Sequence, residues 1–125
     1  MNEIEKLKRL AEQYFYDKDY QNSKTILKKL IKLEPKNSRT NELLGYIYGN
    51  EEKYDEAYQY LTSACQGQNY NTEALYYLGK IQALQKNYVQ GINSLEKAIK
   101  KNWINHPSDL LFYIIYKKNQ EKFFS

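Results

Sequence analysis

Residues of matching size recur along this sequence at a fixed offset of 34 positions. The clearest copy lies between Thr40 and Ala64, and it is echoed both upstream and downstream. The matching residues are Leu44, Gly45, Tyr48, Tyr54, Ala57, Leu61 and Ala64 in the middle copy, Leu10, Ala11, Tyr14, Tyr20, Ser23, Leu27 and Leu30 upstream, and Leu78, Gly79, Tyr88, Gly91, Leu95 and Ala98 downstream. Composition alone does not produce this agreement, so we interpret the chain as an array of three repeats that stack on one another.

Length and composition are consistent with one continuous array. The chain has 125 residues with two prolines and five glycines, which leaves little room for linkers. We expect a single domain over residues 1–125, with repeats at about 4–37, 38–71 and 72–105 and a capping helix over about 106–122. One cysteine excludes an internal disulfide framework, the first residues are too charged for a secretory signal, and no apolar run reaches membrane-spanning length. We therefore expect a soluble, cytoplasmic protein without membrane insertion.

Each repeat shows the apolar spacing of two short helices. Between Leu7 and Tyr14 the apolar residues follow the i, i+3, i+4, i+7 spacing of one helix face. Pro35 ends the second helix because proline cannot continue a helix, Asn37 and Ser38 suit a new start, and Gly67 suits a helix stop. The pattern predicts helices at about 3–16, 20–33, 38–49, 54–66, 72–86 and 88–101, with a last helix reaching about 122.

Small residues occupy one phase of each helix in a pair. They are Ala11, Gly45 and Gly79 on the first helices and Ser23, Ala57 and Gly91 on the second helices. Glycine inside a helix costs about 1 kcal/mol relative to alanine, so its recurrence predicts that the two helices approach closely there. The space around these contacts is expected to be filled by Leu10, Leu44, Leu78, Leu27, Leu61 and Leu95.

These residues resemble the tetratricopeptide repeat pattern, which reads W-x2-L-G-x2-Y, then A-x3-F, then P. The middle copy matches as Leu44-Gly45-x2-Tyr48 followed by Ala57-x3-Leu61, whereas the third copy has Gln82 in place of the tyrosine. The resemblance covers nearly the whole chain. It implies an all-α fold, a right-handed α-solenoid of antiparallel helix pairs with about seven helices.

Groups that carry out catalysis or bind metal are scarce. His106 is the only histidine and lies where a helix start is expected, and Cys65 lies where a cysteine usually packs as a small apolar residue. A base and its orienting partner are lacking, as are a cluster of histidine and cysteine and a glycine-rich phosphate loop. The net charge is +4, but the lysines are scattered among glutamates. We expect no enzymatic activity, no cofactor, no metal and no nucleic-acid partner.

In the tetratricopeptide family the first helix of each pair lines a concave groove that holds a peptide or a helix of a partner. The resemblance therefore implies a binding surface on the groove-facing side of those helices. Tyrosine suits such a surface because it offers a broad contact area at low entropic cost. The expected partner-binding residues are Lys8, Glu12, Tyr16, Arg39, Glu42, Tyr46, Asn50, Glu73, Tyr76 and Lys80, with Glu5 and Leu84 at the same phases.

Other tyrosines have a simpler interpretation as packing between helices. We assign this role to Tyr14, Tyr20, Tyr48, Tyr54 and Tyr88. For Tyr46 and Tyr76, packing and groove exposure are equally good interpretations.

One subfamily clamps the acidic C-terminal tails of large cytosolic chaperones with lysine, asparagine and arginine at set positions. Lys8 matches the first of these positions. The others hold Glu12, Leu43, Glu73 and Tyr77, and two glutamates would repel a dicarboxylate. We therefore exclude this role and expect a ligand with apolar side chains and both signs of charge.

The leading hypothesis is an adaptor or chaperone that binds a peptide segment or helix of another protein. Its architecture is similar to that of the secretion chaperones of bacterial injection systems. A second hypothesis is a self-associating structural subunit, a homodimer through its chain ends with Phe123 and Phe124 as the contact. A third is a regulatory or immunity protein that occludes a partner enzyme.

Overall fold

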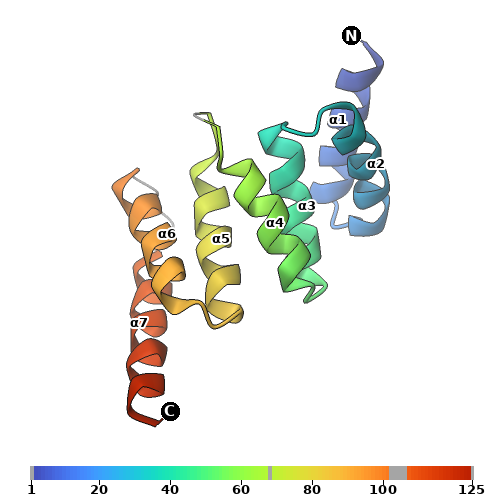
Figure 1. Ribbon diagram of the computed structural model, residues 1–125. Coiled ribbons are helices and arrows are strands. Elements are labelled where there is room, and N and C mark those ends of the chain that lie inside the picture. The colour runs from blue at the N-terminus through green and yellow to red at the C-terminus, as the bar shows by residue number, and fades with distance from the viewer. Residues whose placement is uncertain (1, 68, 102–106, 125) are drawn as a thin grey trace. The chain divides into compact units, whose positions relative to one another are not determined.

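The structure, a computed structural model, describes residues 2–67, 69–101 and 107–124. Within these residues the chain forms seven α-helices and no strand. This confirms the all-α fold and the number of helices that the repeat pattern implied. Two compact units, residues Met1–Tyr70 and Asn71–Ser125, are described separately below. The helices are α1 (Glu3–Tyr16), α2 (Tyr20–Leu33), α3 (Ser38–Asn50) and α4 (Tyr54–Ala64) in the first unit, and α5 (Thr72–Leu84), α6 (Tyr88–Lys100) and α7 (Pro107–Phe124) in the second (Figure 1).

An asparagine immediately precedes and caps the first helix of every pair. The side-chain oxygens of Asn2, Asn37 and Asn71 accept hydrogen bonds from backbone N–H groups of the first turn at 2.8, 2.9 and 3.2 Å. Asparagine is among the best residues for this position because it satisfies a backbone donor that the helix leaves unpaired. The role expected for Asn37 is confirmed, whereas Ser38 is the first residue of α3 and its hydroxyl donates to the carbonyl of Ala64 at 2.7 Å.

The first helix of every pair also ends in the same way. Lys18, Glu52 and Lys86 have left-handed backbone, with φ of 63°, 61° and 66°. The N–H of each donates to the carbonyl three residues earlier, and the following N–H donates to the carbonyl five residues earlier, at 2.8 to 3.0 Å. This is the helix-ending motif in which glycine is usual. The 34-residue period of the sequence is therefore present in the backbone of the turns as well.

Close approach of the paired helices is confirmed at the recurring small residues. A Cβ atom placed on Gly45 would lie 2.5 Å from Cγ of Leu61, and one placed on Gly79 would lie 2.8 Å from Cγ of Leu95. A Cβ on Gly91 would lie 3.0 Å from the carbonyl oxygen of Gly79. These separations are shorter than normal van der Waals contact, so each glycine allows a helix-to-helix distance that a side chain would prevent.

The core is made of the leucines that surround these contacts, with one exception. Leu27, Leu44 and Leu61 are almost completely buried, and Leu78 is also buried. The expectation that Leu10 fills the same kind of space is wrong, because its side chain is 39% exposed. No helix precedes α1 in the described residues, so the outer face of this helix has no neighbour to cover it.

Two helices end earlier than the apolar pattern predicted. α4 ends at Ala64 and not near residue 66, so Gly67 lies beyond the helix and its φ is not positive. Cys65, which we expected to pack within this helix, is half-buried just after the last helical residue. α5 ends at Leu84 because Lys86 takes the left-handed conformation that closes the helix.

The last helix, α7, packs against α6, and Ile114 on it is fully buried. His106, and the side chains of Phe123 and Phe124, lie outside the residues that the structure describes. No helix among the described residues is long and apolar enough to cross a membrane.

Candidate functional site

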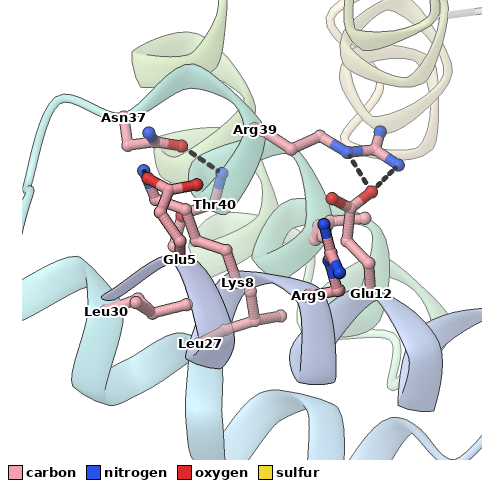
Figure 2. Close-up of a pocket in the computed structure, with 10 residues that line it drawn as sticks. Glu5, Lys8, Arg9, Glu12, Leu27, Leu30, Asn37, Arg39 and Thr40 are labelled. Atoms are coloured by element: carbon pink, nitrogen blue, oxygen red, sulfur yellow. Dashed lines mark hydrogen bonds and ion pairs between the residues drawn. The ribbon is translucent and has the colours of Figure 1, made fainter. Parts of the chain in front are cut away.

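A pocket of about 340 Å³ opens in the first unit where α1, α2 and α3 meet (Figure 2). Its apolar lining is provided by leucines of α2 and α3, and its polar lining comes largely from α1 and the start of α3. The volume is within the range of small-ligand pockets, so it can accept at least one side chain of a partner. The lining residues are Glu5, Lys8, Arg9, Glu12, Leu27, Leu30, Asn37, Arg39, Thr40 and Leu43.

Three of the expected partner-binding residues, Lys8, Glu12 and Arg39, line this pocket, together with Glu5 at the same helix phase. They come from the first helices of two neighbouring repeats, as the helix phases predicted. Figure 2 shows Glu12 and Arg39 pointing toward one another from α1 and α3. The fold therefore brings these residues from two repeats together at one pocket.

Lys8 is held at the edge of the pocket by two carboxylates. Its Nζ lies 2.8 Å from Oε1 of Glu34 and 3.6 Å from Oε1 of Glu5. The close contact with the carboxylate of Glu34 is the main reason why the pKa of Lys8 is raised above its ordinary value. The ammonium group therefore stays charged at neutral pH.

Arg39 links α1 to α3 beside the pocket. Its Nε and Nη2 donate to Oε1 of Glu12 at 3.0 and 2.8 Å, and Nη1 donates to Oε1 of Glu42 at 3.1 Å. Nη2 also donates to the hydroxyl of Tyr16 at 2.7 Å. One guanidinium thus binds three of the other predicted surface residues, and the carboxylate of Glu42 is buried beneath it.

Burial of Arg39 works against its charged form, but the carboxylates outweigh this effect. The hydrogen bond with Glu12 and the negative charges of Glu42 and Glu12 raise the pKa of Arg39 above its ordinary value. Its planar fork can donate to several acceptors in fixed directions, which a lysine could not do. The ion pairs beside the pocket are therefore satisfied within the chain before any ligand arrives.

Four aromatic side chains, Phe15, Tyr16, Tyr20 and Tyr46, form an aromatic cluster on the first unit next to Arg39. The ring of Phe15 is centred 5.6, 5.4 and 5.1 Å from the rings of Tyr16, Tyr20 and Tyr46, in edge-to-face arrangements. Burial and the neighbouring Tyr46 raise the pKa of Tyr20. Tyr16 is 67% exposed, so the aromatic cluster presents an open ring to solvent.

Tyr46 is half-buried in the aromatic cluster, which gives it a packing role as well as partial exposure. Of the tyrosines assigned to packing, Tyr48 is buried, and Tyr14, Tyr20, Tyr54 and Tyr88 are half-buried. Asn50, the last residue of α3, is exposed.

The remaining predicted surface residues lie on α5, in the second unit. Glu73 is half-buried in the first turn and Lys80 is exposed. The ring of Tyr76 is half-buried, with its centre 5.5 Å from that of Tyr77. The structure therefore divides the predicted surface into a set in the first unit, most of which is connected by contacts, and a set on α5.

Arg9 and Phe15 are two of the site residues that were not predicted as binding residues from the sequence. Arg9 lines the pocket and is exposed, and no hydrogen bond or ion pair involves it in the described residues. Phe15 is the centre of the aromatic cluster. The helical phase placed Lys8, Glu12 and Tyr16 on one line, and Arg9 and Phe15 each lie next to that line in sequence, which is the signal that could have identified them.

A family model described as Anaphase-promoting complex, cyclosome, subunit 3 matches residues 7–98. No curated protein matches the sequence. Solved structures of tetratricopeptide repeat domains are similar to the chain at low sequence identity. The Sgt2 TPR domain from Aspergillus fumigatus is 16% identical, with a TM-score of 0.83, and the match covers 98% of this chain and 83% of that chain.

Two further structures show the same likeness in fold. The type III secretion translocator chaperone SycD of Yersinia enterocolitica is 17% identical with a TM-score of 0.82, over 93% of this chain and 86% of that chain. The TPR2B domain of yeast Sti1, in its complex with pHsp70, is 19% identical with a TM-score of 0.74, over 94% of this chain and 97% of that chain.

Proposed function

The chain belongs to the tetratricopeptide repeat family, since the family model described as Anaphase-promoting complex, cyclosome, subunit 3 matches residues 7–98. We propose that it is a non-enzymatic protein-interaction module. It binds a peptide segment or helix of another protein, as an adaptor or chaperone, on the α1–α3 face of its first unit. A cytoplasmic location stays a prediction from the sequence.

The observation that carries this proposal is the pocket between α1, α2 and α3. It combines buried leucines with charged groups, and two of its cations, Lys8 and Arg39, are already fixed by carboxylates of the chain. A partly apolar concave site with a few oriented polar groups is the usual form of a ligand site. Such preorganisation lowers the entropic cost of binding.

Proteins of similar fold support the general class of ligand. The Sti1 TPR2B structure is a complex with pHsp70, and SycD has been solved with a peptide of the translocator YopD. The glutamates at positions 12 and 73 argue against a clamp for acidic chaperone tails, as the sequence indicated.

Site-specific photocrosslinking tests the proposal. A benzophenone amino acid placed at Arg9, on the pocket, is expected to capture a partner protein when the chain is expressed in its native host. The matched control carries the same group at Lys29, an exposed residue of α2 that is not among the pocket-lining residues. A second variant, Glu5→Trp, places a bulky ring at the pocket and should abolish capture at position 9.

The outcomes separate the hypotheses that the sequence left open. Capture of one protein at position 9 but not at position 29, lost in Glu5→Trp, supports binding at the pocket. Capture of a second copy of the chain would favour the self-associating subunit, and capture of an enzyme whose activity falls would favour the regulatory or immunity protein. Equal capture at both positions would contradict the proposed site.

A further inference from the structure

The pocket and the aromatic cluster lie along the same two helices. Both are formed by α1 and α3, with additional residues from α2, and Arg39 contacts both. It lines the pocket, and it donates a hydrogen bond to the exposed Tyr16 of the aromatic cluster. The two apolar features are therefore neighbours on one continuous face of the first unit.

Their separation follows from helix geometry. On α1 the pocket is centred near Lys8 and Arg9, and the aromatic cluster is formed by Phe15 and Tyr16, seven positions further on. At about 1.5 Å per residue this is roughly 10 Å. On α3 the step from Thr40 to Tyr46 gives about 9 Å by the same rise. A polyproline II segment advances about 3.1 Å per residue with three residues per turn, so two of its side chains three positions apart point to the same side and span roughly 9 Å.

The charged groups between the pocket and the aromatic cluster are already paired within the chain, so they need no opposite charge from a ligand. The guanidinium of Arg39 already donates to Glu12, Glu42 and Tyr16. A ligand that brought an additional charge there would have to compete with these ion pairs. Polar, uncharged residues are therefore favoured in the stretch that crosses them.

The pocket and the aromatic cluster favour different side chains of a ligand. The pocket offers the methyl groups of Leu27, Leu30 and Leu43, which suit an aliphatic side chain. The aromatic cluster offers ring edges and faces, with Tyr16 open to solvent, and aromatic pairs gain energy beyond the area that they bury.

We infer that the partner presents an extended segment of polyproline II conformation, with an aliphatic residue in the pocket and an aromatic residue three positions away on the aromatic cluster. The inference rests on the proposed function, since it names the ligand class of the same face. It also excludes a helical ligand with anchors three positions apart, because a helix advances only about 4.5 Å over three residues.

Panning a random dodecapeptide phage library against the full-length chain tests this inference. The enriched peptides should share an aliphatic and an aromatic residue at a spacing of three. A synthetic peptide of that kind is then measured by fluorescence anisotropy against the chain and against Tyr16→Ala, whose ring is 67% exposed. We expect Tyr16→Ala to weaken binding about tenfold, within the range of an interface anchor.

Two controls make this result specific. Tyr116→Ala removes a tyrosine that is 56% exposed on α7 and should leave binding unchanged. Inserting one glycine between the two anchors of the peptide should weaken binding at least as much as Tyr16→Ala does. Circular dichroism of both tyrosine variants verifies that they retain the fold.

The panning experiment distinguishes failure of the two-anchor inference from failure of the proposed function. Enriched peptides that compete at the pocket but carry one anchor, or anchors five to seven positions apart, would overturn the two-anchor inference and leave the proposed function intact. Equal affinity for the chain and for Tyr16→Ala would do the same. If no peptide is enriched over a library panned on Glu5→Trp, the inference and the proposed function both fail.

Discussion

Arg39 on α3 donates two hydrogen bonds, at 3.0 and 2.8 Å, to a single carboxylate oxygen of Glu12 on α1. The two residues belong to different repeats and both line the pocket (Figure 2). The contact therefore joins the first helices of neighbouring pairs at the pocket. It fixes the separation of these helices beside the pocket and couples the site to the stability of the fold.

Replacing Arg39 with alanine should destabilise the chain by about 1–3 kcal/mol, because Glu12 and the buried Glu42 both lose this cation. Arg9→Ala is the matched control, since it removes an exposed arginine of the same pocket and should change stability by less than about 0.5 kcal/mol. Urea unfolding followed by circular dichroism measures both. Equal effects of the two substitutions would show that the ion pairs of Arg39 contribute nothing.

Gly45→Ala should destabilise the chain by about 1–3 kcal/mol, although alanine is the better helix former. The added methyl would lie 2.5 Å from Cγ of the fully buried Leu61. Gly67→Ala is the control, because nothing lies within 4 Å of a Cβ there and its φ is not positive. Thermal melts of both variants test the prediction, and a Gly45→Ala protein that melts at or above the parent temperature would contradict it.

Glycine at the left-handed turn positions should stabilise the fold. Lys18→Gly, Glu52→Gly and Lys86→Gly each relieve a backbone conformation that costs a residue with a side chain about 1–2 kcal/mol. The greater freedom of glycine in the unfolded chain offsets part of this gain, so we expect a net increase of about 0.5–1 kcal/mol per site. Glycine at the exposed helical position Lys29 should instead destabilise by about 1 kcal/mol. Chemical denaturation distinguishes the two signs.

The buried pair of Ser94 and Gln82 should show energetic coupling. The hydroxyl of Ser94 donates to Oε1 of Gln82 at 2.6 Å, and both residues are buried. Ser94→Ala should cost about 1–3 kcal/mol, because the amide oxygen loses this donor in the core. The double variant with Gln82→Leu should cost less than the sum of the two single changes. Additive effects in a double-mutant cycle would indicate that the hydrogen bond is not important.

Sequence periodicity predicted the helices and the close contacts of each pair. Glycine at Gly45 and Gly79 is unfavourable in a helix unless something requires it, and the short distances to Leu61 and Leu95 provide that requirement. The exposure of Leu10 was not predictable in the same way. Periodicity gives the phase of a residue on its helix, but not whether a neighbouring helix is present to cover that face.

Gln82 replaces the tyrosine of the repeat pattern, and Ser94 on the next helix provides a matching polar partner. In the middle repeat Tyr48 stacks on Tyr60, with ring centres 5.4 Å apart. One period later the same two positions hold Gln82 and Ser94, which form a hydrogen bond. The sequence showed the loss of the tyrosine, but the compensating contact depends on which side chains meet across a helix pair.

The candidate site was predicted only in part for a related reason. Lys8, Glu12 and Arg39 followed from helix phase, and the structure brings them to one pocket. The contacts of Arg39 with Tyr16 and Glu42, and the aromatic cluster around Phe15, depend on distances between repeats. Spacing within one repeat does not contain those distances.

The pocket has contributions from three helices in succession, from Glu5 on α1 to Leu43 on α3. A single repeat holds only part of its wall. Duplicating one repeat elsewhere in an array would therefore not copy the pocket, and grafting α1 and α2 alone would leave it open on one side. The smallest piece that carries the whole pocket is one helix pair together with the first helix of the next.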